Sequence, residues 1–454
     1  MRKFISQESG NKYQAFLDVI NNEPFSISDI DHQSLLEFLN FGSFYFENTL
    51  LKGIRKRFTH QIFSLDIVNG FVEESQESDN PMQWEDIDDP FSTFLDFFEQ
   101  RVHHLRDKKI SVDLTGGIDS RLLATVLKHF GVHFDTAFSL NSGDAQEAKI
   151  VKQVADCLGV DLYILESDDI QTEEELDDLF RLSDGLWDLL KLKSLKDNQS
   201  WRQENGYDLI ITGVGGELYK DFWWQQDFPF YNRNNADLEK LISMRMYPAQ
   251  IDENWFGANL QKQFKNYQAE FRKKLQPFVR KSNTRTYDQI YYHVRIKEQV
   301  SILSNITSQF VDTYSPLLEP ELLKIGYNLP RKKRFFNQFH REVITRINPE
   351  VAKIKTTEGN ISVSADLSDK LLDIKNYGLH KTKSLVRKLR SSQTREQVKN
   401  DLKSFDLQKR YQEALMVLRE AGFISNQIPK NHQKIGKKIV GRLITLAEVV
   451  KKIG

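Results

Sequence analysis

Between residues 109 and 212, short apolar runs alternate with longer segments whose apolar residues recur every three or four positions. The short runs are rich in β-branched residues and predict buried strands, whereas the longer spacing is typical of amphipathic helices. We expect strands at residues 110–114, 134–140, 160–165 and 208–212, and helices at residues 120–130 and 145–158. Strands that alternate with helices of this length indicate crossover connections. The pattern therefore predicts an α/β fold built on a doubly wound parallel sheet.

The pattern changes before this region. Residues 34–41 have helical spacing and are followed by a Gly-Ser break and by alternating segments such as residues 60–68, which is typical of a small α+β unit. Ten acidic residues and no Lys or Arg fall between Val72 and Glu99. This charge run predicts a solvated linker, followed by a helix at residues 91–106.

The pattern also changes after this region, and beyond residue 237 it is helical. The last segment, residues 430–454, has seven basic residues against one acidic residue. It predicts a solvated amphipathic helix, with a docking surface for an anionic partner as the alternative. The predicted architecture is thus an α/β core with a small α+β N-terminal part and a helical C-terminal part.

Composition and charge exclude several classes of protein. The 454 residues are 39% hydrophobic, which is enough for sizeable cores, and 63 Lys and Arg against 64 Asp and Glu leave a formal charge of -1. A near-neutral chain lacks the positive field of a typical nucleic-acid binder, so no nucleic-acid partner is expected. No stretch approaches the roughly 18 consecutive apolar residues of a membrane span, and no apolar run follows the basic start of the chain. We therefore expect a cytoplasmic protein with no membrane partner.

Cys157 is the one cysteine of the chain, which excludes an internal disulfide, a CxxC redox pair and a cysteine-rich zinc site. Its helical spacing with Val154 and Leu158 predicts a core residue rather than a nucleophile. The adjacent Trp223 and Trp224 suit the wall of a substrate pocket and suit a core equally well, and the sequence does not choose between the two.

The strand at residues 110–114 runs into two glycines, Gly116 and Gly117, and then into a helix. Glycines let the backbone turn tightly and present its N–H groups, and a helix N-terminus favours anions, so this turn suits a phosphate. Ser120 can donate a hydrogen bond to that anion, and Asp119 can hold a magnesium ion beside it. The alternative is an ordinary turn in which Asp119 or Ser120 caps the helix. The sequence contains neither the GxxxxGK[ST] loop nor the GxGxxG fingerprint of other nucleotide sites.

The segment LTGGIDS, which ends at Ser120, resembles the SGGxDS pyrophosphate loop of the ATP pyrophosphatase (PP-loop) group, whose members include asparagine synthetase. The segment IITGVGGELY resembles the second loop of the asparagine synthetase synthase domain, with Glu217 alone where that family usually has adjacent Asp and Glu. The resemblance implies ATP as a substrate and Mg²⁺ as a cofactor, with Asp119 and Glu217 as metal ligands. It implies that ATP and pyrophosphate are bound by Leu114, Thr115, Gly116, Gly117, Asp119, Ser120, Gly213, Gly215 and Gly216.

Three further segments resemble the same domain. Glu147 takes the acidic position before the family's second helix. The segment DTYSPLL places Asp312 in a glutamate position, which implies that it removes a proton from the attacking amine; a turn residue is the alternative. The segment NPEVAKIK resembles the stretch that delivers a lysine to the phosphates, which implies this catalytic role for Lys355, with Lys353 as the rival and a solvated lysine as the alternative.

The resemblance covers residues 90–365 and implies three parts. They are a truncated glutaminase-like α+β remnant with an acidic linker at residues 1–90, an asparagine synthase-like ATP-binding domain at residues 91–365, and a helical, basic extension at residues 366–454. A glutaminase of this class uses its own first residue as the nucleophile, and removal of the initiating methionine here would expose Arg2. We therefore expect no glutamine hydrolysis by this chain.

The implied activity is ATP-dependent amide formation, in which a carboxylate is adenylated, pyrophosphate leaves into the first loop and an amine takes the acyl group. The expected partners are a small-molecule or peptide carboxylate and ammonia or an amine, with a separate glutaminase as one source of ammonia. A homo-oligomer is compatible with the sequence. The alternatives are a catalytically inactive relative that serves as a binding module, and a tRNA-modifying PP-loop enzyme, which generally needs more cysteines and a basic surface.

Overall fold

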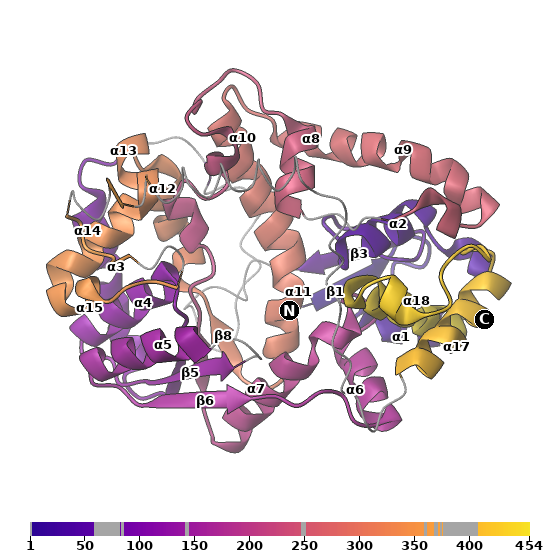
Figure 1. Ribbon diagram of the computed structural model, residues 1–454, viewed down its shortest axis with the longest axis horizontal. Helices are drawn as coiled ribbons and strands as arrows, with labels where there is room; N and C mark the ends of the chain where they lie inside the picture. The colour runs from indigo at the N-terminus through magenta and orange to yellow at the C-terminus, as the bar shows by residue number, and fades with distance from the viewer. Residues whose placement is uncertain are drawn as a thin grey trace.

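The computed structural model describes residues 2–58, 82, 86–140, 145–246, 251–357, 361–366, 371–372, 375 and 407–454. A parallel sheet with the strand order β6-β5-β4-β7-β8 lies in one half of the molecule (Figure 1). Its strands are β4 (Ile110–Asp113), β5 (Asp135–Leu140), β6 (Leu162–Glu166), β7 (Leu209–Ile211) and β8 (Asp312–Tyr314). The four strands that the apolar runs predict are confirmed. The sequence does not predict β8, because its three residues form no apolar run and only their pairing with β7 makes them a strand.

The described residues also form many helices. In chain order they are α1 (Phe16–Asn22), α2 (His32–Phe41), α3 (Pro90–Arg101), α4 (Ile118–His129), α5 (Ala145–Leu158), α6 (Glu173–Ser183), α7 (Lys193–Glu204), α8 (Leu238–Leu241), α9 (Ala258–Leu275), α10 (Asn283–Ile290), α11 (Ser301–Thr307), α12 (Pro320–Asn328), α13 (Arg331–Arg334), α14 (Gln338–Ile347), α15 (Pro349–Lys353), α17 (Leu407–Glu420) and α18 (Lys437–Ile453). The predicted helices at residues 91–106, 120–130 and 145–158 correspond to α3, α4 and α5. Within the part of the chain that the structure describes, no helix is long and apolar enough to cross a membrane.

Helices cover both faces of the parallel sheet, as a doubly wound fold requires. On one face, α4 and α5 share an apolar core with Ile110 and Val112 of β4. On the other face, Arg202 of α7 donates to the hydroxyl of Ser111 at 3.0 Å and forms an ion pair with Asp113. Successive residues of a strand point to opposite faces, which is why the apolar and the polar residues of β4 meet different layers.

The two ends of the chain fold together in the other half of the molecule (Figure 1). The strands β1 (Arg2–Ser6), β2 (Lys12–Tyr13) and β3 (Ile54–Phe58) form an antiparallel sheet with the order β2-β1-β3. They share one apolar core with α2, which contains the helix predicted at residues 34–41, and with α17 and α18 from the C-terminal end. The alternating segment at residues 60–68 and most of the acidic linker lie outside the described residues.

The C-terminal helix α18 is packed rather than solvated, contrary to the prediction from its charge. Val440, Ile444 and Ala447 are fully buried against the core that the chain ends share. Arg442 is also buried, and its Nη1 donates to the backbone carbonyls of Leu39 and Asn40, both at 2.7 Å. These carbonyls belong to the last turn of α2, where a cation is favourable. The net basic charge of the segment therefore does not indicate whether α18 is solvated, because its apolar face is buried.

Cys157 is exposed, so its predicted place in the core is wrong. Successive residues of an α-helix point about 100° apart, which turns Cys157 away from the buried Leu158 that follows it. The buried side of α5 consists of Ile150, Val151, Val154, Ala155 and Leu158.

Candidate active site

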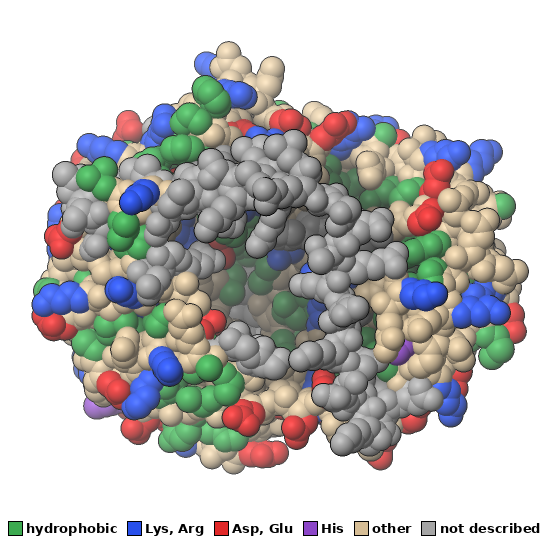
Figure 2. Space-filling model, in the orientation of Figure 1, with side chains coloured by type: hydrophobic (Ala, Val, Ile, Leu, Met, Phe, Trp, Pro, Cys, Tyr) green, Lys and Arg blue, Asp and Glu red, His purple; other side chains and the backbone are tan. Residues whose placement is uncertain are grey.

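The candidate site lies where the carboxyl ends of β4, β7 and β8 meet. The strand register pairs Val112 with Ile211 and Ile211 with Tyr314, so the three following loops start at the same edge of the sheet. In Figure 1 the arrowheads of β5 and β6 point toward the middle of the molecule, and the face in Figure 2 is hollowed near its middle, with hydrophobic side chains on the floor. Open α/β sheets bind ligands at this edge.

The first loop, residues 114–117, is shaped by hydroxyl groups of its own segment. The backbone N–H of Thr115 donates to Oγ of Ser120 at 3.0 Å, and the two hydroxyl oxygens also lie 3.0 Å apart. The N–H of Gly117 donates to Oγ1 of Thr115 at 3.3 Å. Gly117 is the N-cap residue of α4 and no side chain caps the helix, so the capping alternative for Asp119 and Ser120 is wrong. The 12-residue helix leaves its N-terminal N–H groups and their partial positive charge for a ligand.

Gly116 is the most crowded position of this loop. Its backbone N–H donates to Oε1 of Glu147, in the first turn of α5, at 2.8 Å. Its carbonyl accepts a hydrogen bond from the N–H of Thr357 at 3.3 Å. A Cβ atom at this position would overlap Oγ1 of Thr357, which explains the requirement for glycine. A carboxylate oxygen thus accepts the hydrogen bond of one of the N–H groups that the sequence assigns to a phosphate.

The second loop follows β7 and packs its glycines directly against the first turn of α4. A Cβ atom at Gly213 would lie 3.0 Å from the backbone nitrogen of Ser120, and one at Gly216 would lie 2.5 Å from Cγ of Asp119. Gly215 has φ +98°, in the left-handed region that favours glycine. The predicted residues of the two loops therefore meet, and the glycines are what allows the contact.

Asp119 lies between two polar side chains that the sequence analysis does not single out. Nζ of Lys220 is 2.5 Å from its Oδ2, and Nε2 of His340, on α14, is 2.9 Å from its Oδ1. Burial by itself would raise the pKa of Asp119, but the Lys220 ammonium and the His340 ring outweigh it and hold the pKa well below its usual range. Burial also lowers the pKa of His340. The arrangement keeps Asp119 ionised beside one ammonium group and one neutral imidazole.

Glu217 lies beside this group at the start of a 3-10 helix, Gly216–Tyr219. Burial raises its pKa and the charge of Asp119 raises it further, while Lys220 and a hydrogen bond from the Tyr291 hydroxyl act against this. Oε2 of Glu217 is buried without a hydrogen-bond partner among the described residues, and the buried Oδ1 of Asp119 faces Nε2 of His340. Two such oxygens fit a Mg²⁺ ion that is shared with substrate phosphates. In the described ranges, no group of three or more His, Cys, Asp or Glu side chains is placed to hold a metal ion, so substrate phosphates would have to supply further ligands.

The segment with Lys355 is fastened to the same helix as the first loop. Arg121, fully buried in α4, donates from Nη1 to the carbonyl of Ile354 at 2.5 Å and from Nη2 to the carbonyl of Lys355 at 3.0 Å. Burial lowers the pKa of this guanidinium to about 10, which leaves it charged at neutral pH. Together with the contact between Thr357 and Gly116, these bonds place the backbone of Lys355 beside the loop.

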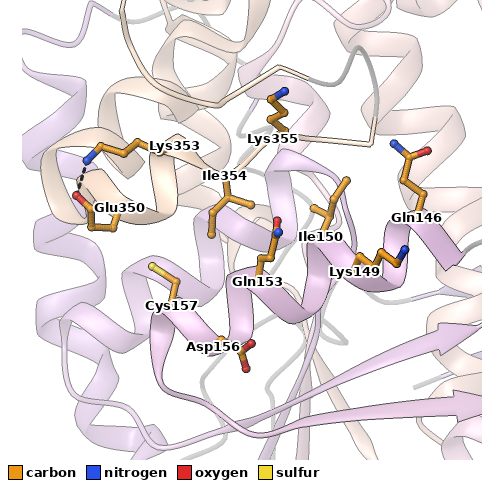
Figure 3. A pocket seen from close by; sticks show the side chains of 10 residues that line it. All are labelled: Gln146, Lys149, Ile150, Gln153, Asp156, Cys157, Glu350, Lys353, Ile354 and Lys355. Atoms are coloured by element: carbon orange, nitrogen blue, oxygen red, sulfur yellow. Dashed lines mark hydrogen bonds and ion pairs between the residues drawn. The ribbon is translucent and has the colours of Figure 1, made fainter.

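The two candidate lysines differ in their surroundings. They line a cavity of about 680 Å³ between α5 and α15 (Figure 3). Nζ of Lys353 forms an exposed ion pair with Glu350 at 2.6 Å, within the same helix. Lys355 is exposed on the following segment, and Figure 3 shows it pointing away from that pair. The geometry therefore favours Lys355 over Lys353 as the lysine that can turn toward the loop.

Asp312 is not brought to this group. It is the first residue of β8, it is exposed, and it pairs in register with Leu209, the first residue of β7. In a parallel sheet the first residues of neighbouring strands lie at the amino edge, opposite the carboxyl edge where the loops meet.

Trp223 and Trp224 are buried in an aromatic core, which decides between the two interpretations of this pair in favour of the core.

Three functional candidates emerge from the structure alone. Lys220 directly follows the second loop in the sequence, and this neighbourhood was the one signal that could have pointed to it. His340 lies in an ordinary amphipathic helix and carries no local signal, whereas Arg121 directly follows the segment LTGGIDS but its contacts with residues 354 and 355 are not visible in the sequence. His340 reaches the site because α14 packs against α4, and the guanidinium of Arg121 acts through the carbonyls of Ile354 and Lys355.

Comparison with known families agrees with the two-loop geometry. The model of the asparagine synthase family matches residues 94–216, from α3 through the first loop to the glycines of the second loop. No curated protein matches the chain. The match supports an asparagine synthase-like family and, in general terms, an ATP-dependent, amide-forming ligase. Lys220, His340 and Lys355 lie beyond the matched residues.

Proposed function

We propose that this protein is an ATP-dependent ligase that adenylates a carboxylate substrate, releases pyrophosphate and transfers the acyl group to ammonia or an amine. The observation that carries the proposal is the meeting of both glycine loops around Asp119, with Gly213 and Gly216 in contact with the first turn of α4. A strand, a glycine turn and a helix N-terminus make an anion site. The match of residues 94–216 to the asparagine synthase family supports the class of reaction.

In this proposal the first loop receives the leaving pyrophosphate. The N–H groups of Gly116 and Gly117 and the hydroxyls of Thr115 and Ser120 donate to its oxygens, and the N-terminus of α4 stabilises the charge that accumulates there. Lys355 supplies a positive charge from the segment that Arg121 holds in place. These groups act mainly by position and charge. Positioning and charge stabilisation lower a large part of the barrier to phosphoryl and nucleotidyl transfer.

Asp119 and Glu217 are the residues that would hold Mg²⁺ in this site. A bound Mg²⁺ ion would neutralise charge on the phosphates of ATP. The buried oxygens of the two carboxylates support this assignment. Asp312 takes no part in the proposed reaction, because it begins β8 at the amino edge of the sheet.

The amine side of the reaction is assigned by exclusion. Cys157 lies exposed on α5, outside the loops, so it is not placed to hydrolyse glutamine at this site. We therefore propose that the nitrogen comes from free ammonia, from an amine-bearing substrate or from a separate glutaminase. The carboxylate is a small molecule or a peptide.

The test is pyrophosphate release from ATP and Mg²⁺ with a panel of carboxylic acids, with and without ammonium, followed by mass spectrometry of the products. We expect acid-dependent formation of AMP and pyrophosphate. Asp119→Ala and Ser120→Ala should abolish turnover without unfolding the chain, whereas Asp312→Ala, an exposed aspartate at the opposite edge, serves as the matched control and should keep it. Full activity in the first two variants would contradict the assignment. An absence of both turnover and ATP binding would favour a non-catalytic binding module.

A further inference from the structure

We propose that Lys220 occupies the cation position beside Asp119 in the nucleotide-free site and thereby excludes a divalent metal ion until a nucleotide arrives. The inference rests on the proposed function, because it concerns the same anion site. Nζ of Lys220 lies 2.5 Å from Oδ2 of Asp119, and the two side chains are only 12% and 19% exposed. An ion pair that is this well shielded is weakly screened by salt. A free metal ion must therefore compete with an ammonium group that is already in contact with its first ligand.

The backbone of Lys220 is fixed, so only its side chain has to move when the site fills. The N–H of Lys220 donates to the carbonyl of Glu217 at 3.2 Å, and its own carbonyl accepts from Nε of Arg334 at 2.9 Å. Arg334 is held in turn by both carboxylate oxygens of Asp288, at 2.7 and 2.8 Å, and lies over the ring of Trp224. The ammonium group is thus carried by a flexible four-carbon stem on a rigid base.

The charges explain why metal and nucleotide should enter together. Before a nucleotide binds, the Asp119 carboxylate is neutralised by the Lys220 ammonium in direct contact with it. A divalent cation that joins this ion pair would bring further positive charge next to the ammonium in a poorly solvated space, which is unfavourable. The triphosphate of ATP brings enough negative charge for both cations. Lys220 can then turn from Asp119 to the phosphates, and the carboxylate becomes available to the metal.

The experiment measures binding of Mn²⁺, a paramagnetic substitute for Mg²⁺, by electron paramagnetic resonance in the absence of nucleotide. The proteins are the full-length wild type, Lys220→Met, which removes the charge at similar length, and Lys220→Arg, which keeps it. We expect weak binding by the wild type and by Lys220→Arg, and an affinity about tenfold or more higher in Lys220→Met. Lys240→Met is the matched control, because Lys240 forms a comparable ion pair with Asp227 at 2.9 Å away from the loops, and it should bind Mn²⁺ as the wild type does.

Two results would overturn the proposal: tight Mn²⁺ binding by the nucleotide-free wild type, or equal affinities in the wild type and Lys220→Met. If Lys220→Met does not fold, as judged by circular dichroism and thermal unfolding, Lys220→Gln replaces it in the same comparison. ATP binding in the presence of Mg²⁺ is measured separately by calorimetry. A wild type that binds no ATP would contradict the proposed function, while the metal titration would still decide the role of Lys220.

Discussion

The guanidinium of Arg121 donates a hydrogen bond to the backbone carbonyl of Lys355, 234 positions further along the chain, at 3.0 Å. Arg121 lies in the first turn of α4, which follows the first loop, so one buried side chain ties the phosphate-binding turn to the segment that carries the candidate catalytic lysine. A side chain of α4 therefore sets the relative position of the loop and the lysine segment.

Replacement of this arginine should loosen the lysine segment. In Arg121→Met the carbonyls of Ile354 and Lys355 lose their donors in a buried place, which should cost about 2–4 kcal/mol in the free energy of unfolding. Hydrogen exchange at residues 354–357 should become faster, and pyrophosphate release should fall. Denaturant unfolding and exchange mass spectrometry measure the two effects. Arg101→Met, which removes an exposed ion pair with Glu321, is the control, and unchanged exchange in Arg121→Met would contradict the proposed link.

Removal of the Glu147 carboxylate should strengthen anion binding by the first loop. In the structure its Oε1 accepts the N–H of Gly116, so a phosphate must displace one negative group and approach against its charge. We expect Glu147→Ala to bind pyrophosphate roughly three- to tenfold more tightly than the wild type. This factor corresponds to the net free energy of one hydrogen bond between neutral groups. Calorimetric titration with pyrophosphate checks this. A weaker affinity would instead show that Glu147 helps to hold the ligand.

A methyl group at Gly216 should disturb the site while the fold remains. Its Cβ atom would lie 2.5 Å from Cγ of Asp119, so the carboxylate must leave its place beside Lys220. We expect Gly216→Ala to lower ATP affinity by about tenfold or more, since forcing an extra carbon into a packed contact typically costs 1–3 kcal/mol. Calorimetry reports the affinity, and the far-ultraviolet circular dichroism should not change. An ATP affinity equal to that of the wild type would contradict the proposal that Asp119 takes part in binding ATP and its metal ion where the two loops meet.

Asp188 should make stability depend on pH far from the site. Burial raises its pKa to about 6, although Lys191 and Arg442 act against this, and its Oδ2 has no hydrogen-bond partner in the described structure. Below pH 4 the carboxyl is protonated in both states and contributes no difference. Between pH 4 and 6 it ionises in the unfolded chain but not in the folded one, so the folded protein loses stability as the pH rises. Relative to Asp188→Asn, the wild type should lose about 3 kcal/mol across this range, and parallel denaturant curves would contradict the prediction.

The amino-acid sequence by itself determined the local parts of this protein. Periodicity predicted four of the five parallel strands and the helices between them, because apolar alternation depends on neighbouring residues only. The segment LTGGIDS predicted an anion-binding turn for the same local reason, since the strand, the two glycines and the helix are consecutive. The glycines of the second loop were likewise visible in the sequence, although their contact with Asp119 was not.

Only the tertiary structure decided which distant residues complete the site. It pairs β8 with β7 and so places Asp312 at the amino edge of the sheet, opposite the loops. It also brings Lys220 and His340 to Asp119, and the segment of Lys355 to Arg121. It also turned the basic C-terminal segment into a buried helix and Cys157 into an exposed residue. These outcomes depend on which helix faces are buried against which partners. Packing between elements far apart in the chain sets that choice, and the composition or spacing of a single segment does not record it.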